Sequence, residues 1–132
     1  MSAFVDTNIL IRHLTGDPPD QAARATRFLA ETDELLVADL VVAEVVYVLE
    51  SYYEVERVRI ADMVRAIIAF RAIRVIDEDL LLRALEVYEF DRLDFAEASL
   101  VAGAERAGVG AVASFDRSID RVRTVERIEP GP

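Results

Sequence analysis

The sequence predicts an α/β protein with a three-layer α/β/α architecture and a central parallel sheet of four to five strands. Strand-like and helix-like segments alternate along the chain, which is typical of a parallel sheet covered by helices on both faces. The 132 residues contain no internal repeat and no linker beyond the tail 129–132, and they suffice to bury one core. We therefore expect a single domain over residues 1–132, with any ligand beyond the carboxyl ends of the strands.

The first segments show this alternation most clearly. Ala3–Val5 is predicted as a buried strand, Thr7–Thr15 as a helix that ends at Gly16, and Pro18–Glu31 as a helix with proline near its start. Apolar periodicity and β-branched runs give the remaining elements. The predicted strands are Leu35–Ala38, Ile73–Ile76, Ala111–Ser114 and Thr124–Ile128, and the predicted helices are Leu40–Tyr53, Ile60–Phe70, Glu78–Phe90 and Asp94–Ala107.

The composition excludes several kinds of chemistry. The chain has no Cys, a single histidine (His13), and no Lys, so all 15 basic residues are Arg. Thiolate metal sites and cysteine nucleophiles are excluded. The absence of Lys excludes a Walker A loop, a Schiff base and the Asp-plus-Lys site of a receiver domain. We assign His13 to packing, so carboxylates must carry any chemistry.

Charge and hydropathy limit the partners and the location of the protein. The net charge of −10 argues against a uniformly basic nucleic-acid surface, but Arg117, Arg121, Arg123 and Arg127 form a local basic cluster. The longest apolar stretch, Leu35–Leu49, is interrupted by acidic residues and is too short to span a membrane. No export signal begins the chain, so we expect a cytoplasmic protein that does not bind membranes.

Two aspartates follow predicted strands directly. Asp6 comes after the first strand, and Asp116 comes after a later one, in Ala-Ser-Phe-Asp. Asp6 alone has an ordinary explanation, because an aspartate at a strand-to-helix junction caps the helix. The carboxyl ends of parallel strands lie at one edge of a sheet, so the two side chains are expected to converge if their strands are neighbours.

Glu44 is unusual because its helix is apolar on nearly every face, in Leu-Val-Val-Ala-Glu-Val-Val-Tyr-Val. Burying an ionised carboxylate without a partner is costly, so Glu44 is expected to be protonated, paired or beside water. A solvent-facing glutamate is the alternative. The segment Leu-Asp-Phe-Ala-Glu-Ala-Ser-Leu adds Asp94 and Glu97, whose spacing also fits a capping box in which Asp94 caps the helix.

A cation would explain several carboxylates in one crevice, because they would otherwise raise one another's pKa. With no Cys and no suitable His, only oxygen ligands remain, and these select hard ions such as Mg²⁺ or Mn²⁺. Such ions keep several waters and bridge to phosphate oxygens. The reaction that suits this site is hydrolysis of a phosphodiester bond, with one ion or two.

Four short motifs together resemble the PIN-domain ribonucleases, and more closely the VapC-type toxins of bacterial toxin–antitoxin pairs. These motifs are Phe-Val-Asp-Thr-Asn, Ala-Glu-Val-Val, Asp-Phe-Ala-Glu-Ala-Ser-Leu and Ala-Ser-Phe-Asp-Arg. The resemblance covers essentially the whole chain. It implies a PIN-like fold, an Mg²⁺- or Mn²⁺-dependent ribonuclease activity, and one or two bound ions.

The resemblance assigns a role to individual residues. The acids of the family fall on Asp6, Glu44, Glu97 and Asp116, which are the expected catalytic residues and metal ligands. Asn8 would orient Asp6, and Ser114 would hold a carboxylate or a bound water. The family usually has Asp where this chain has Glu97, so Asp94, otherwise a helix cap and outer ligand, remains an alternative third acid. Arg117 is a candidate phosphate contact.

The resemblance also implies partners that composition does not reveal. The substrate would be RNA, such as a tRNA, rRNA or mRNA cut at a single-stranded loop. A VapB-type antitoxin would block the acidic groove, and the toxin would form a homodimer. Two alternatives remain open: a PIN-type nuclease of RNA processing or DNA flap cleavage, and a catalytically silent PIN-like module that binds RNA or protein.

Overall fold

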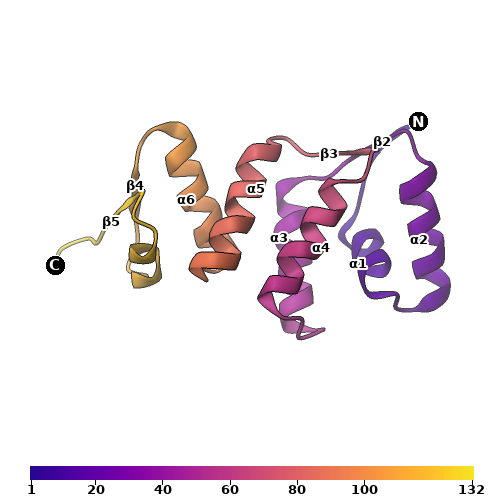
Figure 1. Ribbon diagram of the computed structural model, residues 1–132, viewed down its shortest axis with the longest axis horizontal. Coiled ribbons are helices and arrows are strands. Elements are labelled where there is room, and N and C mark those ends of the chain that lie inside the picture. Colours follow the sequence, from indigo (N-terminus) through magenta and orange to yellow (C-terminus); the bar gives the residue numbers. More distant parts are fainter. The chain divides into compact units, whose positions relative to one another are not determined.

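A computed structural model describes residues 1–132 of the chain. The chain forms two compact parts, Met1–Ile76 and Asp77–Pro132. Figure 1 labels their helices and strands in chain order.

A parallel sheet of three strands organises the first part. It contains β1 (Ser2–Phe4), β2 (Glu34–Leu36) and β3 (Ile73–Arg74), in the order β1-β2-β3. Ala3 pairs with Leu35, and Leu35 pairs in turn with Ile73. Leu35 is fully buried at the centre of the sheet. The middle strand, β2, therefore contributes a fully buried apolar side chain, Leu35, to the core.

Four helices connect these strands: α1 (Thr7–Thr15), α2 (Pro19–Glu31), α3 (Asp39–Ser51) and α4 (Arg57–Ile68) (Figure 1). The bounds of α1 agree with the prediction, because both of its ends carry cap residues. Asp6 accepts a hydrogen bond at the start, and Gly16 takes a left-handed conformation at the end, with φ of 70°. The predicted packing role of His13 agrees with its hydrogen bond to Thr26 on α2.

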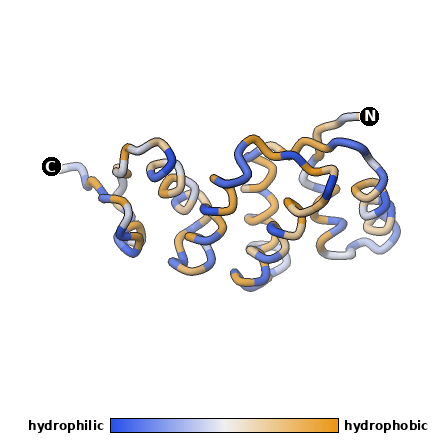
Figure 2. The backbone as a smooth tube through the Cα atoms, turned by 45° about the horizontal axis from the view of Figure 1, so that its top comes forward, coloured by the Kyte–Doolittle hydropathy of each residue, from blue (hydrophilic) through white to orange (hydrophobic).

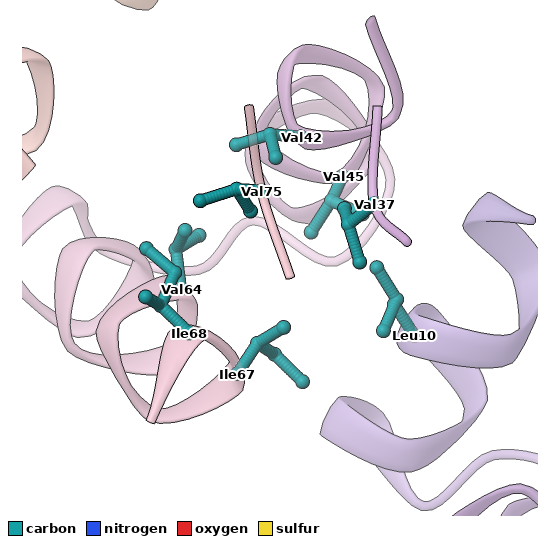
Figure 3. A pocket seen from close by; sticks show the side chains of 8 residues that line it. All are labelled: Leu10, Val37, Val42, Val45, Val64, Ile67, Ile68 and Val75. Carbon is teal, nitrogen blue, oxygen red and sulfur yellow. The ribbon is translucent and has the colours of Figure 1, made fainter. Parts of the chain in front are cut away.

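The core of the first part is apolar and nearly filled. Side chains from α1, α3, α4 and the strand ends surround a cavity of about 10 Å³ (Figure 3). The lining residues are Leu10, Val37, Val42, Val45, Val64, Ile67, Ile68 and Val75. No polar atom lines the cavity, and a cavity of this kind stays dry. This core holds α1 and α3 against each other, and it thereby positions Asp6, which precedes α1, and Glu44, which lies on α3.

The second part begins with α5 (Glu78–Glu86), which continues as the π-helical turn η1 (Val87–Asp91), and then α6 (Phe95–Ala107). The helices α5 and α6 lie side by side (Figure 1) and are joined by the Arg83–Glu105 ion pair of 2.8 Å. Two parallel strands follow, β4 (Ala111–Ala113) and β5 (Glu126–Ile128), with the 3₁₀ turn η2 (Arg117–Arg121) between them.

Most predicted elements are confirmed, and the differences have a clear origin. The five strands occur where expected and all their pairings are parallel, as a sheet of three and a sheet of two. The first strand is shifted by one residue, and the other four are shorter than predicted. For example, Ile73–Ile76 was expected and only Ile73–Arg74 pairs, because pairing stops before the apolar run does. The helix predicted over Glu78–Phe90 changes to a π turn after Glu86, which apolar spacing does not reveal.

Hydropathy along the chain fits this arrangement. Figure 2 shows hydrophobic and hydrophilic residues alternating along the helices, as expected for helices with one buried face. None of the helices combines the length and the apolar character that crossing a membrane requires.

Candidate functional site

Asp6 lies where β1 ends and α1 begins. Its backbone is extended, and its side-chain Oδ1 accepts a hydrogen bond of 2.7 Å from the backbone N–H of Thr7. The side chain is exposed. Asp6 therefore caps α1, which is the ordinary explanation for an aspartate at this position. It also presents a carboxylate at the carboxyl end of β1.

Glu44 lies on α3 and is connected to the same helix terminus. The hydroxyl of Thr7 donates a hydrogen bond of 2.9 Å to Glu44 Oε2. Thr7 itself is buried, with 7% of its surface exposed. One residue thus contacts both Asp6 and Glu44, so the first part of the chain brings these two predicted acids together. Glu44 is exposed, as the solvent-facing alternative expects, and its carboxylate accepts the hydrogen bond from Thr7.

Three further carboxylates lie together in the second part. Asp94 precedes α6, Glu97 lies in its first turn, and Asp116 follows β4. Each offers a carboxylate oxygen, and these oxygens all lie within 4.8 Å of one another. Asp94 and Glu97 were open alternatives for the third acid, and the cluster contains both of them.

The electrostatics of this cluster are asymmetric. Burial raises the pKa of Glu97, and the charges of Asp94 and Asp116 raise it further. Hydrogen bonds from Ser118 lower the pKa of Asp116, since Asp116 Oδ1 accepts from the backbone N–H of Ser118 at 2.9 Å. Glu97 Oε2 is buried and receives no hydrogen bond. A proton on Glu97, or a cation among the three carboxylates, would relieve this unfavourable arrangement.

The capping-box interpretation of this segment is wrong. Asp94 occupies the N-cap position of α6, but its side chain makes no capping hydrogen bond. Its carboxylate belongs instead to the cluster with Glu97 and Asp116. Repulsion in such a cluster is unfavourable without a counter-ion, so the geometry suits a ligand better than a cap.

Among the supporting residues, Ser114 makes a contact that differs from the role that the resemblance implies. Ser114 Oγ accepts a hydrogen bond of 2.9 Å from the backbone N–H of Asp116, so it supports the backbone of that acid. Asn8 is exposed on α1, and the capping bond to Asp6 comes from Thr7 instead. Arg117 is exposed at the first position of η2 and stays a candidate phosphate contact.

The sequence analysis did not predict the structural roles of three residues that organise these groups. Thr7 joins Asp6 to Glu44, and its place between two motif residues was the available signal. Arg121 donates to the carbonyl of Arg92 at 3.0 Å, which attaches η2 to the loop before Asp94. Arg127 is only 12% exposed and makes several contacts around Asp116. Two of the four arginines predicted as a basic cluster therefore make internal contacts.

The chemistry of the donor set favours a hard divalent cation. The candidate ligand atoms are carboxylate oxygens alone, and one of the three residues, Glu97, has an oxygen buried without a hydrogen-bond donor. Mg²⁺ and Mn²⁺ prefer such ligands. The residues present therefore fit a cation of this kind.

Comparisons with known proteins identify relatives of this chain. A family model described as PIN domain matches residues 3–125. No curated protein sequence matches. Among solved structures, a Mycobacterium tuberculosis toxin, VapC20, described as cleaving the sarcin-ricin loop, is 22% identical, with 97% of this chain and 99% of that chain covered and a TM-score of 0.45. VapBC2 from Rickettsia felis, bound to a DNA fragment from its promoter, is 12% identical, with 98% of each chain covered and a TM-score of 0.40.

Proposed function

Because this chain belongs to the PIN-domain family, we propose that it is a metal-dependent endoribonuclease toxin of the VapC type. In this proposal it hydrolyses phosphodiester bonds in tRNA, rRNA or mRNA, acts in the cytoplasm as a homodimer, and is inhibited by a cognate VapB-type antitoxin. The single observation that carries the activity is the carboxylate cluster of Asp94, Glu97 and Asp116, with its buried oxygen that lacks a donor.

Asp6, Glu44, Glu97 and Asp116 would hold one or two Mg²⁺ or Mn²⁺ ions, with Asp94 as an additional ligand. When bound, such an ion activates water at neutral pH and neutralises charge that develops on the phosphate. Thr7 keeps Glu44 oriented through its hydroxyl, and Ser118 keeps Asp116 oriented through its backbone N–H.

The raised pKa of Glu97 links the protonation of its carboxyl to the binding of a cation. Without a cation, burial and the neighbouring charges favour the protonated carboxyl. Glu97 would bind a divalent cation in its ionised form, and any proton on its carboxyl would then leave to solvent. Arg117, exposed beside Asp116, would contact a phosphate of the RNA backbone.

The test is cleavage of total RNA by the purified protein, with Mg²⁺, with Mn²⁺ and with chelator, followed by mapping of the 5′ ends of the products. We expect discrete cuts that require the metal and disappear in Asp6→Asn. Asp62→Asn is the matched control, because Asp62 is an exposed carboxylate on α4 whose partner is Arg65, in the next turn. It should cut as the wild type does.

The same experiment distinguishes the alternatives. Folded protein without bound antitoxin that cuts no RNA under any condition would refute the nuclease and favour a silent binding module. Growth arrest on expression, relieved by a neighbouring antitoxin gene, is expected of the toxin. Metal-dependent cuts without growth arrest would instead favour a processing nuclease.

A further inference from the structure

Arg127 on β5 is the least exposed arginine among the ion pairs of the second part, with 12% of its side chain accessible. We propose that Arg127 is a positioning residue that fixes the segment Ser114–Asp120 and thereby the carboxylate of Asp116. This inference rests on the proposed function, in which Asp116 is a ligand of the reaction's metal.

The guanidinium of Arg127 contacts both ends of this segment. At the start, Nη1 donates a hydrogen bond of 3.0 Å to the carbonyl oxygen of Ser114. At the end, Nε and Nη2 donate to the two oxygens of Asp120, at 3.0 and 3.2 Å. This bidentate pair fixes direction as well as distance, because the guanidinium is planar. Asp116 lies between these two fixed points.

The hydrogen bonds of Asp116 depend on the shape of that segment. Its backbone N–H donates to Ser114 Oγ, and its Oδ1 accepts from the N–H of Ser118, each at 2.9 Å. These bonds set the rotation of the carboxylate toward Glu97 and Asp94. A displacement of about 1 Å at a reacting centre can cost about 100-fold in rate. Arg127 prevents such a displacement by holding Ser114 and Asp120 at once.

Two other contacts provide matched controls. Arg83 also forms a bidentate pair, with Glu105 at 2.8 and 2.9 Å, but it joins α5 to α6 and does not contact the segment. Arg127 has a second acidic partner, Glu129 at 2.8 Å, which lies outside the segment. Removal of Glu129 leaves both of the segment contacts of Arg127 in place.

The experiment compares four variants of the full chain: Arg127→Met, Arg127→Lys, Arg83→Met and Glu129→Gln. Amide hydrogen exchange, measured by NMR, reports on the N–H groups of Asp116 and Ser118 without any need for activity. In Arg127→Met we expect these two amides to exchange at least about 10-fold faster while those of α6 keep their rates. We expect kcat for RNA cleavage to fall about 10- to 100-fold with little change in KM, as for a residue that orients a metal ligand.

The controls separate positioning from stability. Arg127→Lys should recover part of kcat and of the amide protection, because one cationic donor is kept. Arg83→Met should lower the melting temperature and leave kcat and the two amides unchanged. Glu129→Gln should behave as the wild type in all three measurements.

Unchanged exchange and unchanged kcat in Arg127→Met would overturn the proposal, as would an equal loss of kcat in Arg83→Met. If the wild type cuts no RNA, the proposed function fails, and amide exchange still decides whether Arg127 holds Asp116. If Arg127→Met does not fold, Asp120→Asn takes its place, since it removes the same bidentate pair from the opposite side.

Discussion

In the first part of the chain Asp6 and Glu44 receive hydrogen bonds from neutral donors on Thr7, whereas in the second part Asp94, Glu97 and Asp116 face one another. The first pair is oriented without any cation. The second group is satisfied only partly, with a buried oxygen on Glu97 that has no donor. The comparison indicates that N–H and O–H groups of the protein orient both acids of the first pair, whereas in the second group they reach Asp116 and leave an oxygen of Glu97 without a donor.

The largest expected effect is the loss of RNA cleavage when an acid of either group is removed, which tests whether both carboxylate groups serve one reaction. Asp6→Asn and Asp116→Asn should each reduce the RNA-cleavage rate at least about 100-fold, more than the loss expected for a residue that only orients a ligand. The measurement is the initial rate in Mn²⁺ and in Mg²⁺, with Asp62→Asn as control. A large loss in only one variant would mean that the other carboxylate group is not catalytic.

The next largest expected effect is stabilisation of the folded protein by Mn²⁺, which tests which carboxylate group binds the cation. Mn²⁺ at 100 times its dissociation constant should stabilise the folded protein by about 2.7 kcal/mol. Thermal unfolding with and without Mn²⁺ measures this gain. Asp116→Asn should lose most of it, and Thr7→Val should keep most of it. Equal gains in the wild type and in Asp116→Asn would contradict a cation site at the cluster.

A smaller effect concerns the neutral donor of the first pair. Thr7→Val removes the hydroxyl that holds Glu44 and keeps the shape of the buried side chain, so kcat should fall about 10- to 100-fold. Thr26→Val is the matched control, because Thr26 loses only its hydrogen bond with His13. If both variants lose activity equally, the effect is one of general stability rather than of orientation.

The smallest effect is a pH dependence of the metal-free protein. The pKa of Glu97 is raised in the folded state, so the folded protein holds this proton more tightly than the unfolded chain does. The stabilisation is present while the carboxyl is protonated and is lost as pH rises through the raised pKa. Glu97→Gln should therefore be more stable than the wild type at neutral pH, by less than about 1 kcal/mol for this partly solvated group.

Urea unfolding in chelator at acidic and neutral pH measures that difference. Glu126→Gln, which alters an exposed carboxylate of β5, controls for the loss of one negative charge. If Glu97→Gln and the wild type show the same pH dependence, repulsion within the cluster does not contribute to stability.

Local signals in the sequence predicted much of the fold. The cap residues Asp6 and Gly16 gave the bounds of α1, and the alternation of segments gave parallel pairing. The family match confirms the predicted PIN-like α/β fold. The predictions of a single domain and of one site for all four acids stay predictions.

Other features depend on contacts between residues far apart in the chain, which no periodicity reveals. The bond from Thr7 to Glu44 spans 37 positions, and the bond from Arg127 to Ser114 spans 13. The spacing of Asp94 and Glu97 predicted a capping box, because the sequence does not show that Asp116 lies beside them. Helical spacing likewise did not distinguish η1 from a continuation of α5.

The π turn η1 has a consequence for how the chain tolerates changes in length. A π turn contains more residues per turn than an α-helix, so η1 accommodates an extra residue between α5 and the loop before Asp94. Deleting one residue from Val87–Asp91 would restore α-helical winding and rotate the chain that follows by about 100°. The orientation of Asp94 at the start of α6 therefore depends on this turn, and a one-residue deletion there is expected to disturb the carboxylate cluster.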